Sequence, residues 1–413
     1  MSQAKLTLEE AVELLLQNTP TPRFFVSVPL LDALGRVAAG DYVSRFDQPP
    51  FDRSPLDGYA ARCEDIADAT PENPAILTVV QKIYAGAGVG KPIGPGEAAF
   101  ILTGAPLPPG ANCVVAQEDA DKDAERVKIR LPLKKHQNCV FRGEDIKAGH
   151  LMAERGTKLN SAHIGILAGQ GICELEVYPR NNIALMSVGN ELAPPSNRSS
   201  DVPAGETPLP FGMIYESNSW TLAARVLELG GESHVAKCAM DDPCQIATAL
   251  EKLLGENDFV ITTGGVSVGE RDYMPQALKK LNANTLFHGL KYKPGGITLG
   301  VLKDGKLILC LPGNPFAAFM SFELLARPAL GKLAGLKDFR ACRIRAVLRG
   351  TFPKHSHQRR FIRGCMVGGE VFVEKEGHAA GSLSSLTRCN CLIDIPAASP
   401  PLPDGSAVEV LTL

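Results

Sequence analysis

Short apolar runs alternate with segments of helical periodicity between Asn182 and Gly331. The expected strands are NIALMSV, SHVAKC, FVITT and KLILCL. The expected helices are SWTLAARVLEL, PCQIATALEKLL, a segment after Tyr273, and FAAFMSFELLA. This alternation favours right-handed crossovers and a parallel sheet with helices on both faces. We therefore expect a doubly wound α/β domain over residues 181–331.

The hydrophobic pattern changes character outside this stretch. Thr7 and Glu10 form a capping-box signature at the start of a helix that Pro20 ends. Short β-like runs broken by glycine and proline fill residues 46–140, and alternating runs return after residue 332. We therefore predict a small β-domain (46–140) inserted into an N-terminal and linking domain (1–45 with 141–180). A β-barrel-like domain (332–413) follows the α/β domain.

One connection exceeds the usual loop length. Residues 193–212 are rich in proline, serine and glycine and separate an expected strand from its helix. A plain insertion is our interpretation, and a lid over a site is the alternative.

Composition narrows the class of partner. The chain has 413 residues, a formal net charge of −2 and 45% hydrophobic residues, which indicates several globular domains. Such a balance gives no general attraction to nucleic acids or anionic membranes, and no apolar run approaches a membrane span. We expect a cytoplasmic protein with neither partner. The 11 cysteines form no C-x-x-C motif, so reduced thiols are expected rather than a zinc ribbon.

The polar residues of the α/β segment gather in turns that follow its strands. Open α/β sheets bind ligands at the carboxyl ends of their strands. The turns there carry the acids Glu191, Asp241, Asp242 and Asp272. Grouping carboxylates is unfavourable unless a cation neutralises them, which predicts a Mg²⁺ site. As alternatives, Asp242 before Pro243 suits a helix N-cap, and Asp272 suits a first helical turn.

Two of these turns also fit an anionic substrate. The stretch TTGGVSVG exposes backbone N–H groups but is not a Walker A loop, because no Gly-Lys-Ser/Thr follows. The turn LPGNP fixes an unusual backbone immediately before a helix. The candidate substrate-binding residues are Gly264, Gly265, Ser267, Gly269, Pro312, Gly313, Asn314 and Pro315. Together with the acids they indicate phosphate chemistry assisted by Mg²⁺.

A second polar group lies in the β-rich half of the chain. Asp52 and Asp57 belong to FDRSPLDGYA, Thr103 to LTGAP, and Asp145 to RGED. An Asp-Gly pair by itself is typical of an ordinary turn.

In combination, these segments resemble the molybdopterin molybdenumtransferase family, the MoeA proteins, and the related gephyrin E-domain. The matching stretches are SPLDGYA, LTGAPLP, RGEDI, VGNEL, DDP, TTGGVSVGERDY, KYKPG and LPGNP. The resemblance implies a homodimer of four-domain subunits whose α/β domain is similar to molybdopterin adenylyltransferase. It implies insertion of molybdate into adenylated molybdopterin, with Mg²⁺-assisted release of AMP. Molybdopterin adenylyltransferase would be the upstream partner.

Carried over by position, the resemblance assigns roles to individual residues. Asp57, Thr103, Asp145 and Lys293 would be catalytic, and Pro312 and Pro315 would shape the turn. The metal ligands would be Glu191, Asp241 or Asp242, and Asp272. Asp57 and Asp145 would face the α/β site across the dimer.

The chain departs from the family pattern at several positions. Gly296 and Ile297 stand where the family has lysine and proline, Gly289 where a basic residue is common, and Asn190 where GDEL has an acid. Gly296 marks either a lost cationic contact or a backbone that needs a positive φ. A non-catalytic molybdopterin-binding or scaffold paralogue is therefore the alternative function. A nucleotide-amide hydrolase is disfavoured because SPLDGYA and LTGAPLP lie outside the α/β domain.

Overall fold

The computed structural model describes residues 4–195, 209–237, 241–266, 273–373 and 380–413. The chain divides into two compact units. The first comprises Met1–Gly40, Arg155–Asn160 and Glu174–Leu413, and the second Asp41–Glu154 and Ser161–Cys173. The domain boundaries expected near residues 46, 140 and 180 stay a prediction.

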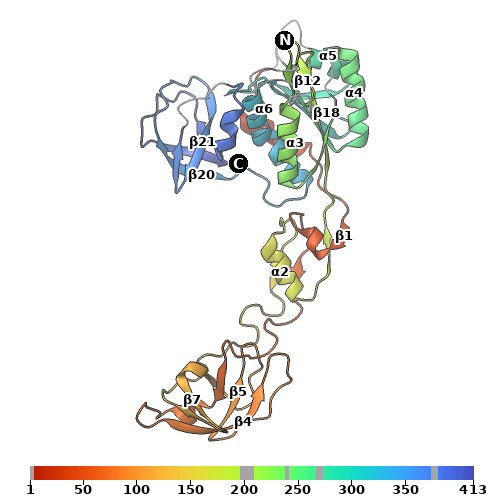
Figure 1. Ribbon diagram of the computed structural model, residues 1–413. Coiled ribbons are helices and arrows are strands. Elements are labelled where there is room, and N and C mark those ends of the chain that lie inside the picture. The colour runs from red at the N-terminus through yellow and green to blue at the C-terminus, as the bar shows by residue number, and fades with distance from the viewer. Residues whose placement is uncertain (1–3, 196–208, 238–240, 267–272, 374–379) are drawn as a thin grey trace. The chain divides into compact units, whose positions relative to one another are not determined.

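The first unit is built around a six-stranded sheet in the order β14-β11-β15-β19-β18-β16 (Figure 1). Its strands are β11 (Asn182–Ser187), β14 (Glu232–Val235), β15 (Phe259–Thr263), β16 (Asn284–His288), β18 (Leu299–Lys303) and β19 (Lys306–Leu311). The first four in that order are parallel, which confirms the doubly wound core. β18 and β16 instead pair antiparallel, a feature not predicted from the alternation of strands and helices. The Asp304-Gly305 turn joins β18 to β19 as a hairpin, and Asp-Gly is a hairpin signal.

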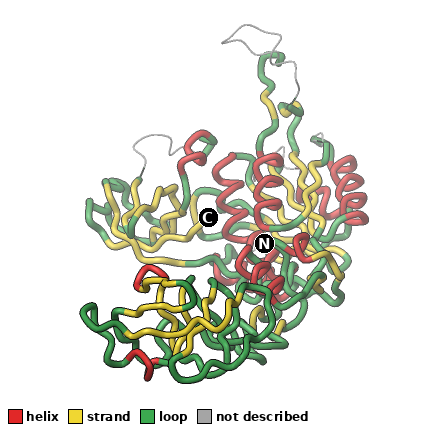
Figure 2. The backbone as a smooth tube through the Cα atoms, turned by 60° about the horizontal axis from the view of Figure 1, so that its bottom comes forward, coloured by secondary structure: helices red, strands yellow, loops and turns green. Residues whose placement is uncertain are grey.

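Helices cover both faces of this sheet, and Figure 2 shows them beside its strands. The helices of the unit are α1 (Leu8–Gln17), α3 (Asn218–Leu229), α4 (Pro243–Glu256), α5 (Tyr273–Lys280), α6 (Pro315–Ser321) and α7 (Arg327–Leu333). α1, α3, α6 and α7 share one hydrophobic core with β11, whereas α4 and α5 enclose a second core on the opposite face. Thr7 and Glu10 form the predicted capping box at the start of α1.

A closed β-barrel completes the first unit, as the resemblance implied. Its strand order is β17-β21-β22-β20-β24-β23, and an additional pairing of β21 with β23 closes it. The strands are β17 (Tyr292–Lys293), β20 (Arg343–Arg349), β21 (Arg359–Val367), β22 (Glu370–Phe372), β23 (Cys391–Ile395) and β24 (Ala407–Thr412). Leu348, Ile393 and Val410 are fully buried inside it. β17 lies in the chain between β16 and β18 of the α/β sheet, so the two substructures meet near Lys293.

Short strand pairs occupy the rest of the unit. β1 (Val26–Pro29) pairs antiparallel with β10 (Glu174–Val177). β12 (Leu192–Ala193) pairs parallel with β13 (Ile214–Tyr215), at the two ends of the long Pro-rich connection. Residues 196–208 of that connection lie outside the described residues, so the choice between insertion and lid stays open.

The second unit contains its own six-stranded sheet, in the order β6-β3-β5-β4-β8-β7. The strands are β3 (Gly58–Ala61), β4 (Ala75–Ile83), β5 (Glu97–Ile101), β6 (Cys113–Ala116), β7 (Ala120–Asp123) and β8 (Arg126–Ile129). All pairs are antiparallel except β4 with β5. The unit also holds β2 (Tyr42–Val43), β9 (Leu151–Ala153) and α2 (Ser161–Gly169). In the parts of the chain that the structure describes, no helix has the length and apolar character to cross a membrane.

Candidate functional site

Three turns at the carboxyl ends of the parallel strands lie against one another. The Val188 N–H donates to Thr263 O at 2.9 Å, and the Gly264 N–H donates to Leu311 O at 3.1 Å. These bonds connect the ends of β11, β15 and β19. The sequence predicted this meeting point, because parallel neighbours end at the same edge of a sheet.

Glycine is required where the first two turns touch. Gly264 has a φ of +86°, and a Cβ at this position would lie 2.4 Å from Val188 O. Gly265 also has a positive φ, +66°. The backbone therefore approaches more closely than any side chain permits, and the predicted substrate-binding residues Gly264 and Gly265 form a fixed surface. Ser267 and Gly269 lie outside the described residues.

The third turn is held from a neighbouring helix. Asn314 is the N-cap of α6, and Pro315 takes its first position. The side chain of Asn218, at the start of α3, donates to Gly313 O at 2.7 Å. Pro312 is buried behind the turn, while Gly313 and Asn314 are exposed. The predicted residues of this turn thus expose main-chain atoms to solvent, and the turn itself is held in place by α3 and α6.

The predicted acids divide by their local contacts. Glu191 is exposed, and its carboxylate lies over Gly189, where an added Cβ would be 2.6 Å from Oε2. The Asp241 N–H donates to Asn190 Oδ1 at 3.1 Å, so Asp241 lies next to the turn that carries Glu191. Asp242 Oδ1 accepts the Gln245 N–H at 2.7 Å as the N-cap of α4. The N-cap alternative for Asp242 is therefore confirmed, and Asp241 is the acid that remains available.

The metal site stays a prediction. Within the described ranges, no group of three acidic, histidine or cysteine side chains is arranged to hold a metal ion. Asp272, the fourth predicted ligand, lies outside those ranges. The oxygen donors of Glu191 and Asp241 match the ligand chemistry of Mg²⁺.

The two glycines in the Lys293 region have different explanations: close backbone packing at Gly296 and a positive φ at Gly289. A Cβ on Gly296 would lie 2.5 Å from Tyr292 O and 2.7 Å from Leu290 O. Gly289 has a φ of +88°, and a Cβ on it would lie 3.3 Å from side-chain carbons of Lys5. The lost-contact interpretation of Gly296 is therefore wrong, because these two carbonyls leave no room for a side chain. The positive-φ interpretation is wrong as well, because Gly296 does not have a positive φ. Lys293 itself is exposed on β17, paired with Arg360 of β21.

A basic cavity of about 760 Å³ beside this turn was not predicted from the sequence. Its lining includes Pro294, Phe316, Arg349, Lys354, Arg360 and Arg363. The Arg363 guanidinium lies 3.7 Å from the Phe316 ring centroid, and its Nη2 donates to Ser382 O at 2.9 Å. Phe316 follows Pro315, so the LPGNP turn and the barrel contribute to one wall. The RRFIRG run of three arginines on a strand was the available signal.

The cation density of this cavity favours an anion. Arg360 has a buried Nε with no hydrogen-bond partner among the described residues, and its guanidinium lies 6.0 Å from the Phe352 ring centroid. A buried donor without a partner is unfavourable, whereas an oxyanion would satisfy it. Arginine is suited to this role because its planar donors match tetrahedral oxyanions.

In the second unit the structure brings Asp57 and Thr103 together. Asp57 Oδ1 accepts both the Thr103 N–H and the Thr103 hydroxyl, each at 2.7 Å. These hydrogen bonds hold the pKa of Asp57 below its ordinary value, the backbone bond being the larger cause. Asp57 is therefore a fixed carboxylate rather than a free turn residue.

Asp145 is presented differently. It is exposed, and its N–H donates to Gln48 O at 3.1 Å. Its turn is held by two other acids. Asp47 accepts the Arg142 Nε at 2.6 Å, and Asp52 accepts the Arg142 N–H at 2.8 Å. Asp47 and Asp52 are thus structural, and Asp145 is free to face a ligand.

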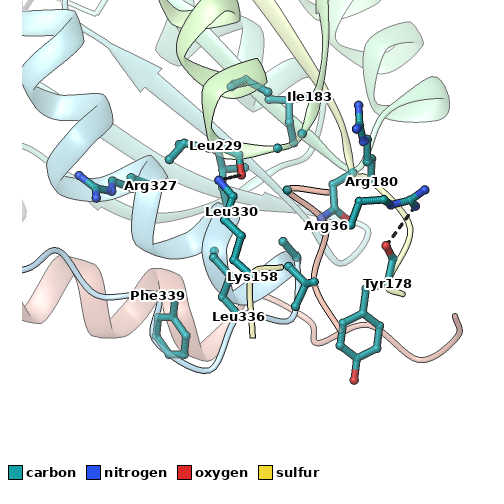
Figure 3. A pocket seen from close by; sticks show the side chains of 18 of the residues that line it. Arg36, Lys158, Tyr178, Arg180, Ile183, Leu229, Arg327, Leu330, Leu336 and Phe339 are labelled. Carbon is teal, nitrogen blue, oxygen red and sulfur yellow. Dashed lines mark hydrogen bonds between the residues drawn. The ribbon is translucent and has the colours of Figure 1, made fainter. Parts of the chain in front are cut away.

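A smaller cavity of about 200 Å³ lies at the opposite end of the sheet, beside Ile183 at the start of β11 (Figure 3). Lys158 donates to Leu229 O and Glu228 O at the end of α3, and Arg36 donates to Tyr178 O. Its lysine therefore caps a helix, and its lining also includes Arg36, Arg180, Arg327 and Arg340 among apolar side chains. The position at the amino ends of the strands does not suit the site of an open α/β sheet.

The chain joins an α/β domain to a closed β-barrel, and both contribute residues to one basic cavity. Three family profiles match: the MoeA N-terminal region (domains I and II) over residues 6–171, a probable molybdopterin-binding domain over 184–332, and the MoeA C-terminal region (domain IV) over 345–413. The chain belongs to the MoeA family of molybdopterin molybdenumtransferases, and it is a transferase of molybdenum cofactor biosynthesis.

Individual relatives agree over nearly the full length. The molybdopterin molybdenumtransferase of Staphylococcus aureus (strain Mu50) is 31% identical over 98% of this chain and 95% of its own. The Staphylococcus epidermidis (strain RP62A) protein is 32% identical over 94% and 90%. The crystal structure of the molybdopterin biosynthesis moeA protein from Pyrococcus horikoshii OT3 superposes with a TM-score of 0.82, at 31% identity, over 99% of this chain and 100% of that one.

Proposed function

We propose that this enzyme inserts molybdate into adenylated molybdopterin, with Mg²⁺-dependent cleavage of the phosphoanhydride and release of AMP. The observation that carries the proposal is the arginine-lined cavity, whose wall includes the residue after the LPGNP turn. An oxyanion bound there would lie beside a turn suited to a phosphorylated substrate. Molybdate and the two phosphates of the substrate are all anions.

Each group of residues has the role in this reaction that its chemistry suits. The backbone of Gly264, Gly265 and Gly313 supports the phosphates, because only glycine permits such close approach. Arg360 and Arg363 hold the molybdate, and exposed Lys293 offsets phosphate charge. Glu191 and Asp241, with Asp272, would hold Mg²⁺, which supplies charge neutralisation at the phosphoanhydride.

The second unit supplies a fixed negative charge. Asp57, ionised and oriented by Thr103, and exposed Asp145 are suited to orient the substrate or accept a proton. We propose that they act on the α/β site of the partner subunit in a homodimer.

Exposed apolar side chains of the first unit support self-association. Trp220 and Leu227 stand seven positions apart on α3 and are 53% and 57% exposed. Residues at this spacing share one helix face. Trp220→Glu should therefore shift the protein from dimer to monomer in light scattering. A monomeric wild-type protein would contradict the homodimer.

The supply of substrate implies an upstream enzyme. Adenylated molybdopterin is the product that a molybdopterin adenylyltransferase must provide, and we propose that transferase as a partner in the cytoplasm.

The direct test follows AMP. The protein is incubated with adenylated molybdopterin and molybdate, with Mg²⁺ or with EDTA, and AMP is measured by chromatography. We expect AMP release that requires Mg²⁺ and is promoted by molybdate. Tight substrate binding without turnover under any divalent metal would instead support the scaffold alternative.

A further inference from the structure

The four-residue segment Glu216–Ser219, at the start of α3, lies between the first and third turns of the site. Upstream of it, the Ile214 N–H donates to Glu191 O at 2.9 Å, and the Glu216 N–H donates to Ala193 O at 2.8 Å. Downstream, Asn218 Nδ2 donates to Gly313 O at 2.7 Å. The segment is thus attached to the acid-bearing turn at one end and to the LPGNP turn at the other.

Glu216 anchors this segment from below. Its side chain is 4% exposed, and Oε1 accepts the Ser187 hydroxyl and the Ser219 N–H, each at 2.7 Å. A buried carboxylate needs such donors because burial removes it from water. Its place before the first turn of α3 adds the favourable field of the helix N-terminus.

The carboxylate also sets the direction of the neighbouring hydroxyls. Ser187 has one proton, which it gives to Glu216. Its contacts with Ser219 Oγ and Thr263 Oγ1, both 2.8 Å, must then be donated by those residues. The Thr263 proton therefore points into the protein at the end of β15. Phosphate donors at the adjacent turn are consequently backbone N–H groups rather than this hydroxyl.

Asn218 controls the position of the third turn. Its amide fixes the Gly313 carbonyl, and Gly313 faces Gly264, because a Cβ added to Gly313 would meet Gly264 Cα at 3.4 Å. Loss of the amide would free the turn to move relative to Gly264, while the buried core under it stays intact.

We propose that Asn218 is a positioning residue of the transferase: it holds the LPGNP turn against the Gly264 turn so that the phosphorylated substrate meets one preformed surface. Glu216 holds Asn218 in place. This inference rests on the proposed function, and it names contacts that act on substrate affinity rather than on the chemical step. Such contacts are equal in the ground and transition states and therefore change KM more than kcat.

The test compares Asn218→Ala and Asn218→Asp with Asn284→Ala. Asn284 is an exposed residue at the start of β16, at the far end of the sheet from the turns. We expect Asn218→Ala to raise the KM for adenylated molybdopterin about five- to tenfold, with kcat within about twofold. Asn218→Asp should raise KM further, because a carboxylate would oppose the Gly313 carbonyl. Asn284→Ala should match the wild type.

Melting temperatures separate positioning from folding. An exposed hydrogen bond should leave Tm within about 2 °C of the wild type. An unchanged KM in both Asn218 variants, or a fall in Tm with no change in KM, would overturn the proposal. If the wild type binds adenylated molybdopterin but releases no AMP, the proposed function fails, and calorimetric affinity then decides: weaker binding by Asn218→Ala supports positioning, and equal binding overturns it. Absence of wild-type binding overturns both.

Discussion

The two polar groups predicted from the sequence are built in different ways. In the α/β region the predicted site is formed by main-chain atoms. Gly264, Gly265 and Gly313 lie in turns that are held by main-chain hydrogen bonds and by the side chain of Asn218. In the second unit the site is a side-chain charge, Asp57, fixed by Thr103 at an accessible position. We therefore expect substitutions that change the backbone shape of the first region to lower the free energy of unfolding strongly. Substitutions that change the charge in the second region should have little effect on folding.

The largest effect is expected at Gly264. Gly264→Ala places a Cβ 2.4 Å from Val188 O at a φ of +86°, so we expect a loss of about 3 kcal/mol or more in the free energy of unfolding. Gly255→Ala, in α4 with open space around it, is the control and should be neutral or stabilising by up to about 1 kcal/mol. Urea unfolding measures both. Equal free energies of unfolding for the two variants would contradict the claim that the Gly264 turn requires glycine.

Gly296→Lys tests the same argument beside the cavity. The new side chain would meet two backbone carbonyls, so we expect a loss of about 2 kcal/mol and no tighter molybdate binding. Gly88→Lys, at an open loop position of the second unit, is the control and should leave stability nearly unchanged. Thermal melts together with the molybdate dependence of AMP release give the answer. A stable variant with a lower molybdate requirement would restore the lost-contact interpretation.

Arg363→Ala removes a charge from the barrel wall. It loses the stacking on Phe316 and the bond to Ser382 O, and we expect kcat/KM to fall by about 10- to 100-fold. Arg130→Ala, which breaks only an exposed pair with Asp121, should leave kcat/KM unchanged. A wild-type rate in Arg363→Ala would show that the cavity does not hold the oxyanion.

The smallest effect is expected at Thr103. Thr103→Val keeps the backbone N–H but removes the hydroxyl, so the pKa of Asp57 should rise part of the way towards its ordinary value. Because the folded pKa is lowered, the associated stability is present above the unfolded pKa and disappears as the pH falls through the folded one. Carboxyl NMR titration of the wild type and the variant measures the shift. An unchanged Asp57 titration would contradict the assigned cause.

Local patterns explain which features could be predicted. The capping box at Thr7, the N-cap at Asp242 and the turns at the strand ends depend on near neighbours in the sequence, and the structure has each of them. The contact of Arg363 with Phe316 joins residues far apart in the chain, so no local sequence pattern predicts it. The same holds for Glu216, whose hydroxyl partners come from β11 and β15.

The most direct test is a crystal structure of the protein with adenylated molybdopterin and molybdate, in which anomalous scattering locates the molybdenum. We predict the molybdenum in the 760 Å³ cavity beside Arg360 and Arg363, with the phosphates on the turns of Gly264 and Gly313. Molybdenum in the 200 Å³ cavity beside Lys158, or phosphates away from those turns, would contradict the account.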